Sequence, residues 1–158
     1  MVLTAGSTAP DFELPDENGN LHRLSDFAGK NVVVYFYPKD DTPGCTTEAC
    51  SFRDQYNEFE KSGVPVIGIS PDSPQRHSKF KAKYSLPFLL LSDETHKVLE
   101  SYGVWGRKKM MGKEYDGVFR TTFLIGKDRK IIKVFKNVKP DGHSLEILQA
   151  LEELNPEH

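Results

Sequence analysis

One uninterrupted apolar stretch, within residues 31–37, reads Asn-Val-Val-Val-Tyr-Phe-Tyr. β-Branched and aromatic side chains favour strands, and the lack of alternation with polar residues is typical of a strand buried on both faces. We therefore predict a central strand at 31–37. A second apolar run at 64–70 predicts another strand. A helix between the two would make a βαβ unit, because parallel strands need a crossover connection.

The helix between these strands is predicted to span residues 42–61. Thr42 suits the N-cap, Pro43 suits the first helical position, and Gly63 suits the C-terminal stop. At about 100° per residue, one apolar stripe must face the sheet, and Cys50 lies about 140° from its first member. The stripe consists of Cys45, Ala49, Phe52, Tyr56 and Phe59.

Shorter patterns complete the prediction of an α/β fold. Residues 11–24 resemble a hairpin around Pro-Asp-Glu-Asn-Gly-Asn, and residues 25–27 a helical turn. Strands alternating with helices, followed by a late hairpin and a closing helix, predict one thioredoxin-like sandwich domain over 1–158, with a central mixed β-sheet flanked by helices and an N-terminal β-hairpin. The remaining predicted elements are helices at 73–84, 94–102 and 144–154 (the last with Leu145, Leu148 and Leu151 at helical spacing), strands at 88–91, 121–125 and 131–135, and a glycine-containing basic loop at 103–120, with some strand character, whose Arg107, Lys108 and Lys109 are expected to be solvated.

Composition narrows the classes of function. The 158 residues carry a net charge of −2, which argues against a nucleic-acid partner. No apolar run approaches the roughly 18 residues that span a bilayer, and the N-terminus lacks the pattern of a signal peptide. We expect a cytoplasmic protein, or an organellar one if a transit peptide was removed. Structural disulfides are rare in the cytosol, so two cysteines there favour catalysis, redox chemistry or metal binding.

The two cysteines, Cys45 and Cys50, occupy the start of the helix predicted at 42–61. A free thiol with a pKa near 8.5 is only about 3% ionised at pH 7. Unpaired backbone N–H groups and the helix dipole favour a thiolate in the first turn. The hydroxyl of Thr42, three residues before Cys45, is placed to reach that thiolate or a substrate beside it.

The five-residue spacing carries a mechanical consequence. On an intact helix, Cα atoms five residues apart are roughly 8–9 Å apart, whereas a disulfide needs about 4.4–6.8 Å. Cys45 and Cys50 can therefore bond only if the first turns unwind. Gly44, Thr46 and Thr47 are poor helix formers, which keeps the cost of unwinding low.

The residues alone leave alternatives open. The numbers of cysteines and histidines are compatible with three other interpretations: two buried unreactive cysteines, half of a metal site, or a Cys–His dyad. Two ligands at this spacing suit a helix badly, and no other Cys or His pair completes a tetrahedron, so no metal is expected. The five histidines are scattered, mostly in polar turn or helix contexts: His22, His77, His96, His143 and His158.

The chain resembles the peroxiredoxins, and the signature P-x-x-x-T-x-x-C carries the resemblance. It is matched by residues 38–45, Pro-Lys-Asp-Asp-Thr-Pro-Gly-Cys. The continuation Cys-Thr-Thr-Glu-Ala-Cys is similar to the bacterioferritin comigratory protein, or peroxiredoxin Q, branch. Further familial segments cover nearly the whole chain: Ala-Pro-Asp-Phe at 9–12, Tyr-Gly-Val-Trp-Gly at 102–106, Arg-Thr-Thr-Phe-Leu-Ile at 120–125 and Val-Lys-Pro-Asp-Gly-His at 138–143.

The resemblance implies a thiol peroxidase acting on hydrogen peroxide and organic hydroperoxides, without a cofactor. Cys45 would attack the peroxide and become a sulfenic acid. Cys50 would resolve it as an intramolecular disulfide, reopened by a thioredoxin-type or glutaredoxin-type reductant. No partner subunit is then needed, which favours a monomer. The other implied roles are contact with thiolate and peroxide by Thr42, charge stabilisation by Arg120, shielding of the pocket by Pro38, and orientation of the arginine by Glu48.

Two rival functions remain at this point. A general thiol–disulfide oxidoreductase would use the same fold, but that chemistry usually has the shorter Cys-x-x-Cys spacing. A peroxide-sensing redox switch would change a partner surface instead of turning over.

Overall fold

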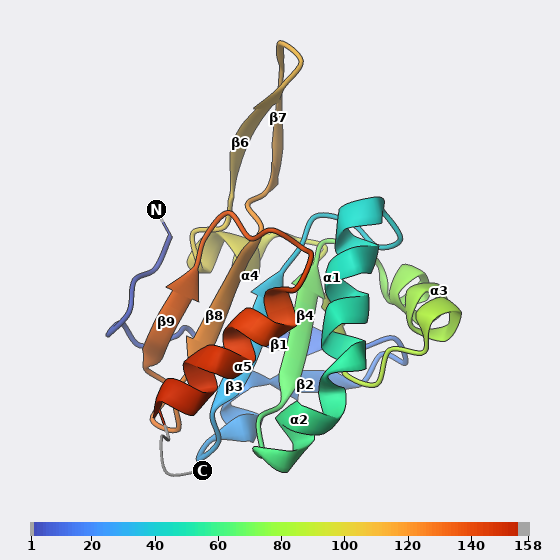
Figure 1. Ribbon diagram of the computed structural model, residues 1–158. Coiled ribbons are helices and arrows are strands. Elements are labelled where there is room, and N and C mark those ends of the chain that lie inside the picture. The colour runs from blue at the N-terminus through green and yellow to red at the C-terminus, as the bar shows by residue number, and fades with distance from the viewer. Residues whose placement is uncertain (1, 155–158) are drawn as a thin grey trace.

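A five-stranded mixed sheet forms the centre of the fold (Figure 1). A computed structural model of the chain describes residues 2–154. The strand order is β5-β4-β3-β8-β9, with β3, β4 and β5 parallel and with β8 and β9 antiparallel to their neighbours. The predicted mixed sheet is thus confirmed. Its strands are β3 (Val32–Phe36), β4 (Val66–Ser70), β5 (Leu89–Ser92), β8 (Thr121–Ile125) and β9 (Ile131–Phe135).

The side chains of β3 divide the core into two layers. Every β3 residue is buried, as the apolar run predicted. Val33 and Tyr35 join one cluster, whereas Val34 and Phe36 join the other, because successive side chains of a strand point to opposite faces. Each face therefore needs its own cover of helices or loops.

The two faces are covered by different elements. The cluster around Tyr35 includes Phe52, Phe59, Phe80 and Ile147, which come from four helices; Figure 1 shows two of these, α1 and α5, lying across this face. The four are α1 (Pro43–Asp54), α2 (Tyr56–Lys61), α3 (Pro74–Tyr84) and α5 (His143–Leu154). The opposite cluster uses the N-terminal segment, β1 (Glu13–Pro15), η1 (Leu24–Phe27) and α4 (Lys97–Ser101). The predicted N-terminal hairpin is confirmed by the antiparallel pairing of β1 with β2 (Leu21–Arg23).

Several predicted helices have other limits in the structure. The helix predicted at 42–61 is interrupted at Gln55, whose ψ of 10° separates α1 from α2. The helix predicted at 94–102 shortens to α4, preceded by His96 in a left-handed conformation. In α5, Ile147 and Leu151 face the core, whereas Leu145 is exposed. Of the leucines at helical spacing, Leu151 thus belongs to the core and Leu145 does not.

The basic segment predicted mainly as a loop is a two-stranded hairpin. It consists of β6 (Trp105–Met110) and β7 (Lys113–Val118), which project away from the main sheet (Figure 1). Met111 and Gly112 both have positive φ, as a two-residue hairpin turn of primed type requires. Between residues 2 and 154, no helix is long and apolar enough to cross a membrane.

Candidate active site

Cys45 lies in the first turn of α1, at the carboxyl end of β3. Its side chain is buried and joins the core cluster under Tyr35. Thr42 has the extended backbone of an N-cap residue, and its carbonyl accepts a hydrogen bond from Thr46 N–H. Pro43 begins the helix and has no backbone N–H, so one of the unpaired donors of the first turn is absent. Because Cys45 lies in this turn, its thiol is at the positive end of the helix dipole.

Arg120 connects this thiol to a buried carboxylate. It lies between β7 and β8, and one of its terminal nitrogens donates to Cys45 Sγ at 3.2 Å. The other terminal nitrogen donates to Glu48 Oε1 at 2.7 Å. The two acceptors are one turn apart on α1, so the planar guanidinium fork can bind both at once. Gly44 leaves room for the fork, since a Cβ there would lie 3.2 Å from Arg120 Nη2.

Burial and charge act in opposite directions on the pKa values of Glu48 and Arg120. Burial raises the pKa of Glu48 to about 7, against the opposing charge and hydrogen bond of Arg120. Glu48 is fully buried, and its second oxygen, Oε2, has no hydrogen-bond partner among the described residues. Burial alone would lower the pKa of Arg120, but the charges of Glu48 and Cys45 hold it above its ordinary value. A cation is thereby fixed against the sulfur.

The hydroxyl of Thr42 donates to the carbonyl of Lys39 at 2.9 Å. No hydrogen bond joins Thr42 to Cys45 among the described residues. Because the hydroxyl proton is donated to the Lys39 carbonyl, the lone pairs of Thr42 Oγ1 remain available to accept a hydrogen bond. Pro38 begins the same loop, residues 38–42, directly after the strand-pairing residue Tyr37.

Cys50 lies on another side of α1 from Cys45. It is half-buried, and both cysteines are free thiols. Together with Thr47 and Leu145 it lines a surface groove between α1 and the start of α5. A second protein thiol can therefore approach Cys50 from solvent more readily than it can approach Cys45.

The β6–β7 hairpin brings a second cation toward the site. Lys108, expected to be solvated, is half-buried and donates from Nζ to the carbonyl of Val118 at 2.9 Å. Burial lowers its pKa, as does the charge of Arg120, whereas Cys45 opposes the shift. Gly117 makes room for this side chain, because a Cβ there would lie 3.0 Å from Lys108 Cδ. The glycine on the neighbouring strand is a sequence signal that could have indicated this placement.

Two of the histidines predicted in polar contexts are buried instead. His143 begins α5, is hydrogen-bonded to Thr122 at 2.7 Å and to Glu146 at 2.9 Å, and burial lowers its pKa. His77 lies in α3 and is completely inaccessible. Its spacing from Phe80 follows the inner stripe of that helix, which is the signal that sequence reasoning overlooked.

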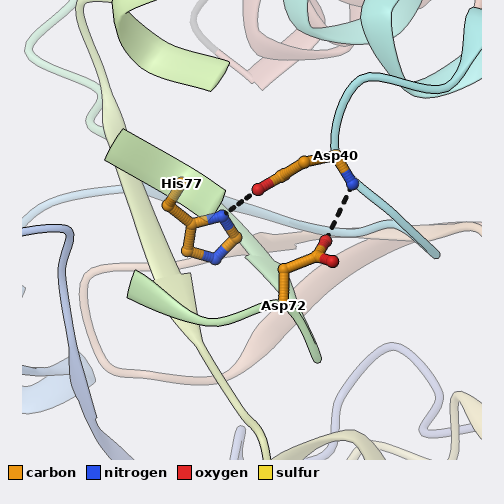
Figure 2. Close-up of side chains that lie close together, drawn as sticks. All are labelled: Asp40, Asp72 and His77. Carbon is orange, nitrogen blue, oxygen red and sulfur yellow. Dashed lines mark hydrogen bonds and ion pairs between the residues drawn. The ribbon is translucent and has the colours of Figure 1, made fainter. Parts of the chain in front are cut away.

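His77 belongs to a buried polar network with Asp40 and Asp72 (Figure 2). One ligand-type atom from each lies within 4.8 Å of the others, a spacing found in metal sites. Protein donors and acceptors already engage these atoms: His77 Nδ1 lies 2.6 Å from Asp40 Oδ2, and Asp72 Oδ2 accepts from Asp40 N–H at 2.8 Å and from Ser70 Oγ at 2.8 Å. The cluster fits a hydrogen-bonded network and not a metal centre.

A buried cysteine at a helix N-terminus, held by an arginine on a thioredoxin-like fold, defines the peroxiredoxin class of thiol peroxidases. The family model for AhpC/TSA matches residues 5–134, and the chain belongs to this family. It is 50% identical over 155 residues to peroxiredoxin Bcp of Bacillus subtilis, covering 98% of this chain and 99% of that protein. Against peroxiredoxin Bcp of Escherichia coli it is 52% identical over 151 residues, covering 96% and 97%.

Solved structures agree with these relatives. Xylella fastidiosa PrxQ superposes with a TM-score of 0.92 at 33% identity, covering 98% of each chain. A bacterioferritin comigratory protein of Xanthomonas campestris, described with alkyl peroxide reduction activity, gives a TM-score of 0.87 at 34% identity, again with 98% coverage of both. The resemblance to the Bcp and peroxiredoxin Q branch is thus confirmed, and the chain is a peroxidase of the peroxiredoxin type.

Proposed function

We propose that the chain reduces hydrogen peroxide and organic hydroperoxides through a cycle that uses both of its cysteines, with a thioredoxin-type protein as reductant. The observation that carries the proposal is the guanidinium of Arg120, which contacts Cys45 Sγ and Glu48 Oε1 simultaneously at the start of α1. A fixed cation beside a sulfur favours the thiolate, which is the nucleophilic form. Cys50, five residues later on the same helix, supplies the second thiol.

In the first step, the Cys45 thiolate attacks one oxygen of the peroxide and the O–O bond breaks. Sulfur is oxidised to a sulfenic acid, and the second oxygen leaves as water or an alcohol after taking a proton. Arg120 stabilises negative charge as it moves from sulfur to the leaving oxygen. The Thr42 hydroxyl donates its own proton to the Lys39 carbonyl, so Thr42 Oγ1 accepts a hydrogen bond from the incoming hydroperoxide. Pro38 covers the loop side of the pocket.

In the second step, the Cys50 thiol gives up its proton and its sulfur attacks the sulfenic sulfur. The S–O bond breaks as the disulfide forms, and the leaving hydroxide takes up a proton and departs as water. The continuous helix of α1 keeps the two Cα atoms roughly 8–9 Å apart, so its first turns must open. Both sulfurs belong to one helix, which makes a second subunit unnecessary and favours a monomer. A dithiol protein then reduces the disulfide through a mixed disulfide on the more accessible Cys50.

The test is peroxide consumption with purified protein, thioredoxin, thioredoxin reductase and NADPH. Wild type should turn over, Cys45→Ser should not, and Cys50→Ser should consume one equivalent of peroxide and stop. Replacing thioredoxin with glutathione and glutaredoxin compares the two reductants. Steady turnover by Cys50→Ser with thioredoxin would remove Cys50 from the cycle. Mass spectrometry of the oxidised wild type should show one intramolecular disulfide and no covalent dimer.

A further inference from the structure

Asp40 and His77 form a buried pair next to the active-site loop (Figure 2). The loop comprises residues 38–42 and carries both Pro38 and Thr42. Asp40 is 2% exposed and His77 is 0% exposed, and Asp40 Oδ2 lies 2.6 Å from His77 Nδ1. Ionisable groups are this deeply buried only when they are paired, so the contact has to be maintained for the loop to stay folded.

The hydrogen-bond partners fix the protons of this pair. His77 Nε2 lies 3.0 Å from the carbonyl of Leu91, which can only accept, so Nε2 carries a proton. Asp40 Oδ1 accepts from the hydroxyl of Tyr37 at 2.5 Å. A further proton lies between Asp40 Oδ2 and His77 Nδ1. Every polar atom of the two side chains is therefore satisfied within the protein, and removing either side chain takes away the short contact of one buried polar atom of the other.

The backbone of the loop is anchored at the same point. Asp40 N–H donates to Asp72 Oδ2, and Asp72 in turn accepts from Arg76 Nε at 3.0 Å. The next residue, Asp41, has a positive φ of 58° and holds that conformation through Lys83 Nζ and the Tyr84 hydroxyl, each at 2.9 Å. The two consecutive residues Asp40 and Asp41 thus tie the loop to α3 and to the segment before that helix.

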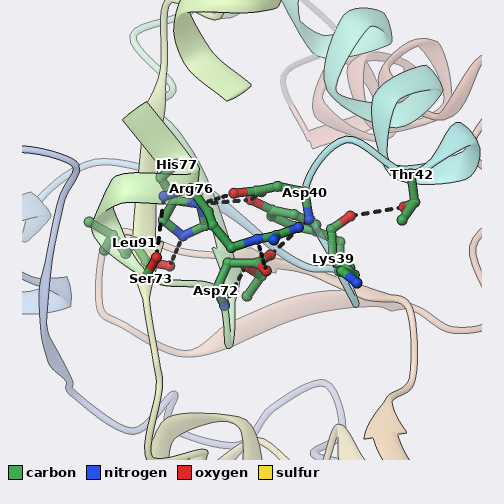
Figure 3. Close-up of polar contacts among 10 residues, drawn as sticks. Lys39, Asp40, Thr42, Asp72, Ser73, Arg76, His77 and Leu91 are labelled. Atoms are coloured by element: carbon green, nitrogen blue, oxygen red, sulfur yellow. Dashed lines mark hydrogen bonds and ion pairs between the residues drawn. The ribbon is translucent and has the colours of Figure 1, made fainter. Parts of the chain in front are cut away.

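This anchoring extends to Thr42 by one further hydrogen bond. The residue before Asp40 is Lys39, whose carbonyl accepts the Thr42 hydroxyl proton (Figure 3). The direction of that carbonyl depends on the peptide that joins Lys39 to Asp40, whose N–H is held by Asp72. The orientation of Thr42 Oγ1 is therefore determined by the buried network.

We propose that Asp40 and His77 are positioning residues for peroxide reduction, because their buried pair holds the loop that directs Thr42 Oγ1 toward the incoming hydroperoxide. The inference rests on the role assigned to Thr42 in the proposed function. Neither residue is hydrogen-bonded to Cys45 among the described residues, so their effect passes through the loop. Arg120, which contacts the sulfur directly, is held by Glu48 and belongs to a different part of the chain.

The experiment compares Asp40→Ala with its matched control Asp40→Asn. Asparagine keeps the volume, accepts from Tyr37 with its oxygen, and donates from its amide to the unprotonated Nδ1 of a neutral His77. Alanine removes both contacts. Since a misplacement of about 1 Å costs roughly 100-fold in rate, Asp40→Ala should lower the second-order rate constant with hydrogen peroxide by about 10- to 100-fold relative to Asp40→Asn. His77→Leu, of similar volume, should show the same fall and serves if Asp40→Ala does not fold.

A second rate separates positioning from general damage to the site. Alkylation of Cys45 by iodoacetamide, measured in a Cys50→Ser background, needs the thiolate and Arg120 but makes no use of the Thr42 acceptor. It should change by less than about threefold in variants that circular dichroism shows to be folded. Equal peroxide rates in Asp40→Ala and Asp40→Asn, or equal falls in the peroxide and alkylation rates, would overturn the inference. If the wild type itself reacts with peroxide no faster than a free thiol, the proposed function fails instead.

Discussion

Thr47 offers a direct way to test whether α1 opens during the cycle. It lies on the exposed side of the helix, between Cys45 and Cys50, and its hydroxyl donates to the carbonyl of Pro43 at 2.9 Å. Alanine and glycine at this position both remove that hydrogen bond, so the two variants differ only in helix propensity. The comparison between them isolates the cost of unwinding the segment between the cysteines.

The expected difference in the rate of disulfide formation follows from the geometry of α1 and from the helix propensities of alanine and glycine. The Cα atoms of Cys45 and Cys50 must approach by about 2 Å or more from their separation on an intact helix. Unwinding of α1 is expected to stop before Phe52, because this side chain is fully buried and its ring is stacked on Tyr35 with the ring centroids 4.7 Å apart. Glycine disfavours a helix by about 1 kcal/mol relative to alanine. If unwinding precedes the disulfide, Thr47→Gly should therefore form it about fivefold faster than Thr47→Ala, with wild type between them.

The assay is rapid acid quenching after mixing reduced protein with one equivalent of hydrogen peroxide. Mass spectrometry then counts sulfenic acid, trapped with dimedone, and disulfide at each time. The rate of sulfenic acid formation should be equal in both variants, because Thr47 makes no hydrogen bond to Cys45 or Arg120 in the described structure. Equal rates of disulfide formation, or a faster Thr47→Ala, would refute the reasoning that the helix opens before the sulfurs join.

Three further predictions concern the site and its support. Arg120→Lys cannot contact Cys45 and Glu48 with one planar fork, so stopped-flow oxidation by hydrogen peroxide should slow by roughly 100-fold or more; a change below threefold would contradict a charge-stabilising role. Burial raises the pKa of Glu48 from 4.5 to about 7, so the folded state binds the proton more tightly than the unfolded state. The wild type should therefore lose about 3 kcal/mol of unfolding free energy as pH rises between those values. Urea denaturation at both ends of the range should show this loss, and Glu48→Gln should lack it. Phe52→Ala should lower the unfolding free energy by about 3–5 kcal/mol, measured in urea, and a loss below about 1 kcal/mol would show that the packing against Tyr35 is replaceable.

Much of the fold followed from local patterns. The run at 31–37 specified a strand buried on both faces, and the structure confirms β3 there. The turn chemistry around Thr42 and Pro43 specified where α1 begins. These features depend on residues close together in the chain, whose periodicity and capping preferences act before tertiary contacts form. The break at Gln55 has no such local signal, since neither glycine nor proline occurs there.

By itself, the sequence determined the spacing of Cys45 and Cys50 and the helix start on which Cys45 lies. The family resemblance implied Arg120 as the cation beside the sulfur, but residue patterns could not choose it, because it is 75 positions away in the chain, and only the tertiary structure shows the contact. It also decided that Asp40 meets His77 across 37 positions and that Lys108 turns inward. Such contacts depend on strand order and on burial, which bring distant segments together, and residue spacing along one segment contains no information about either.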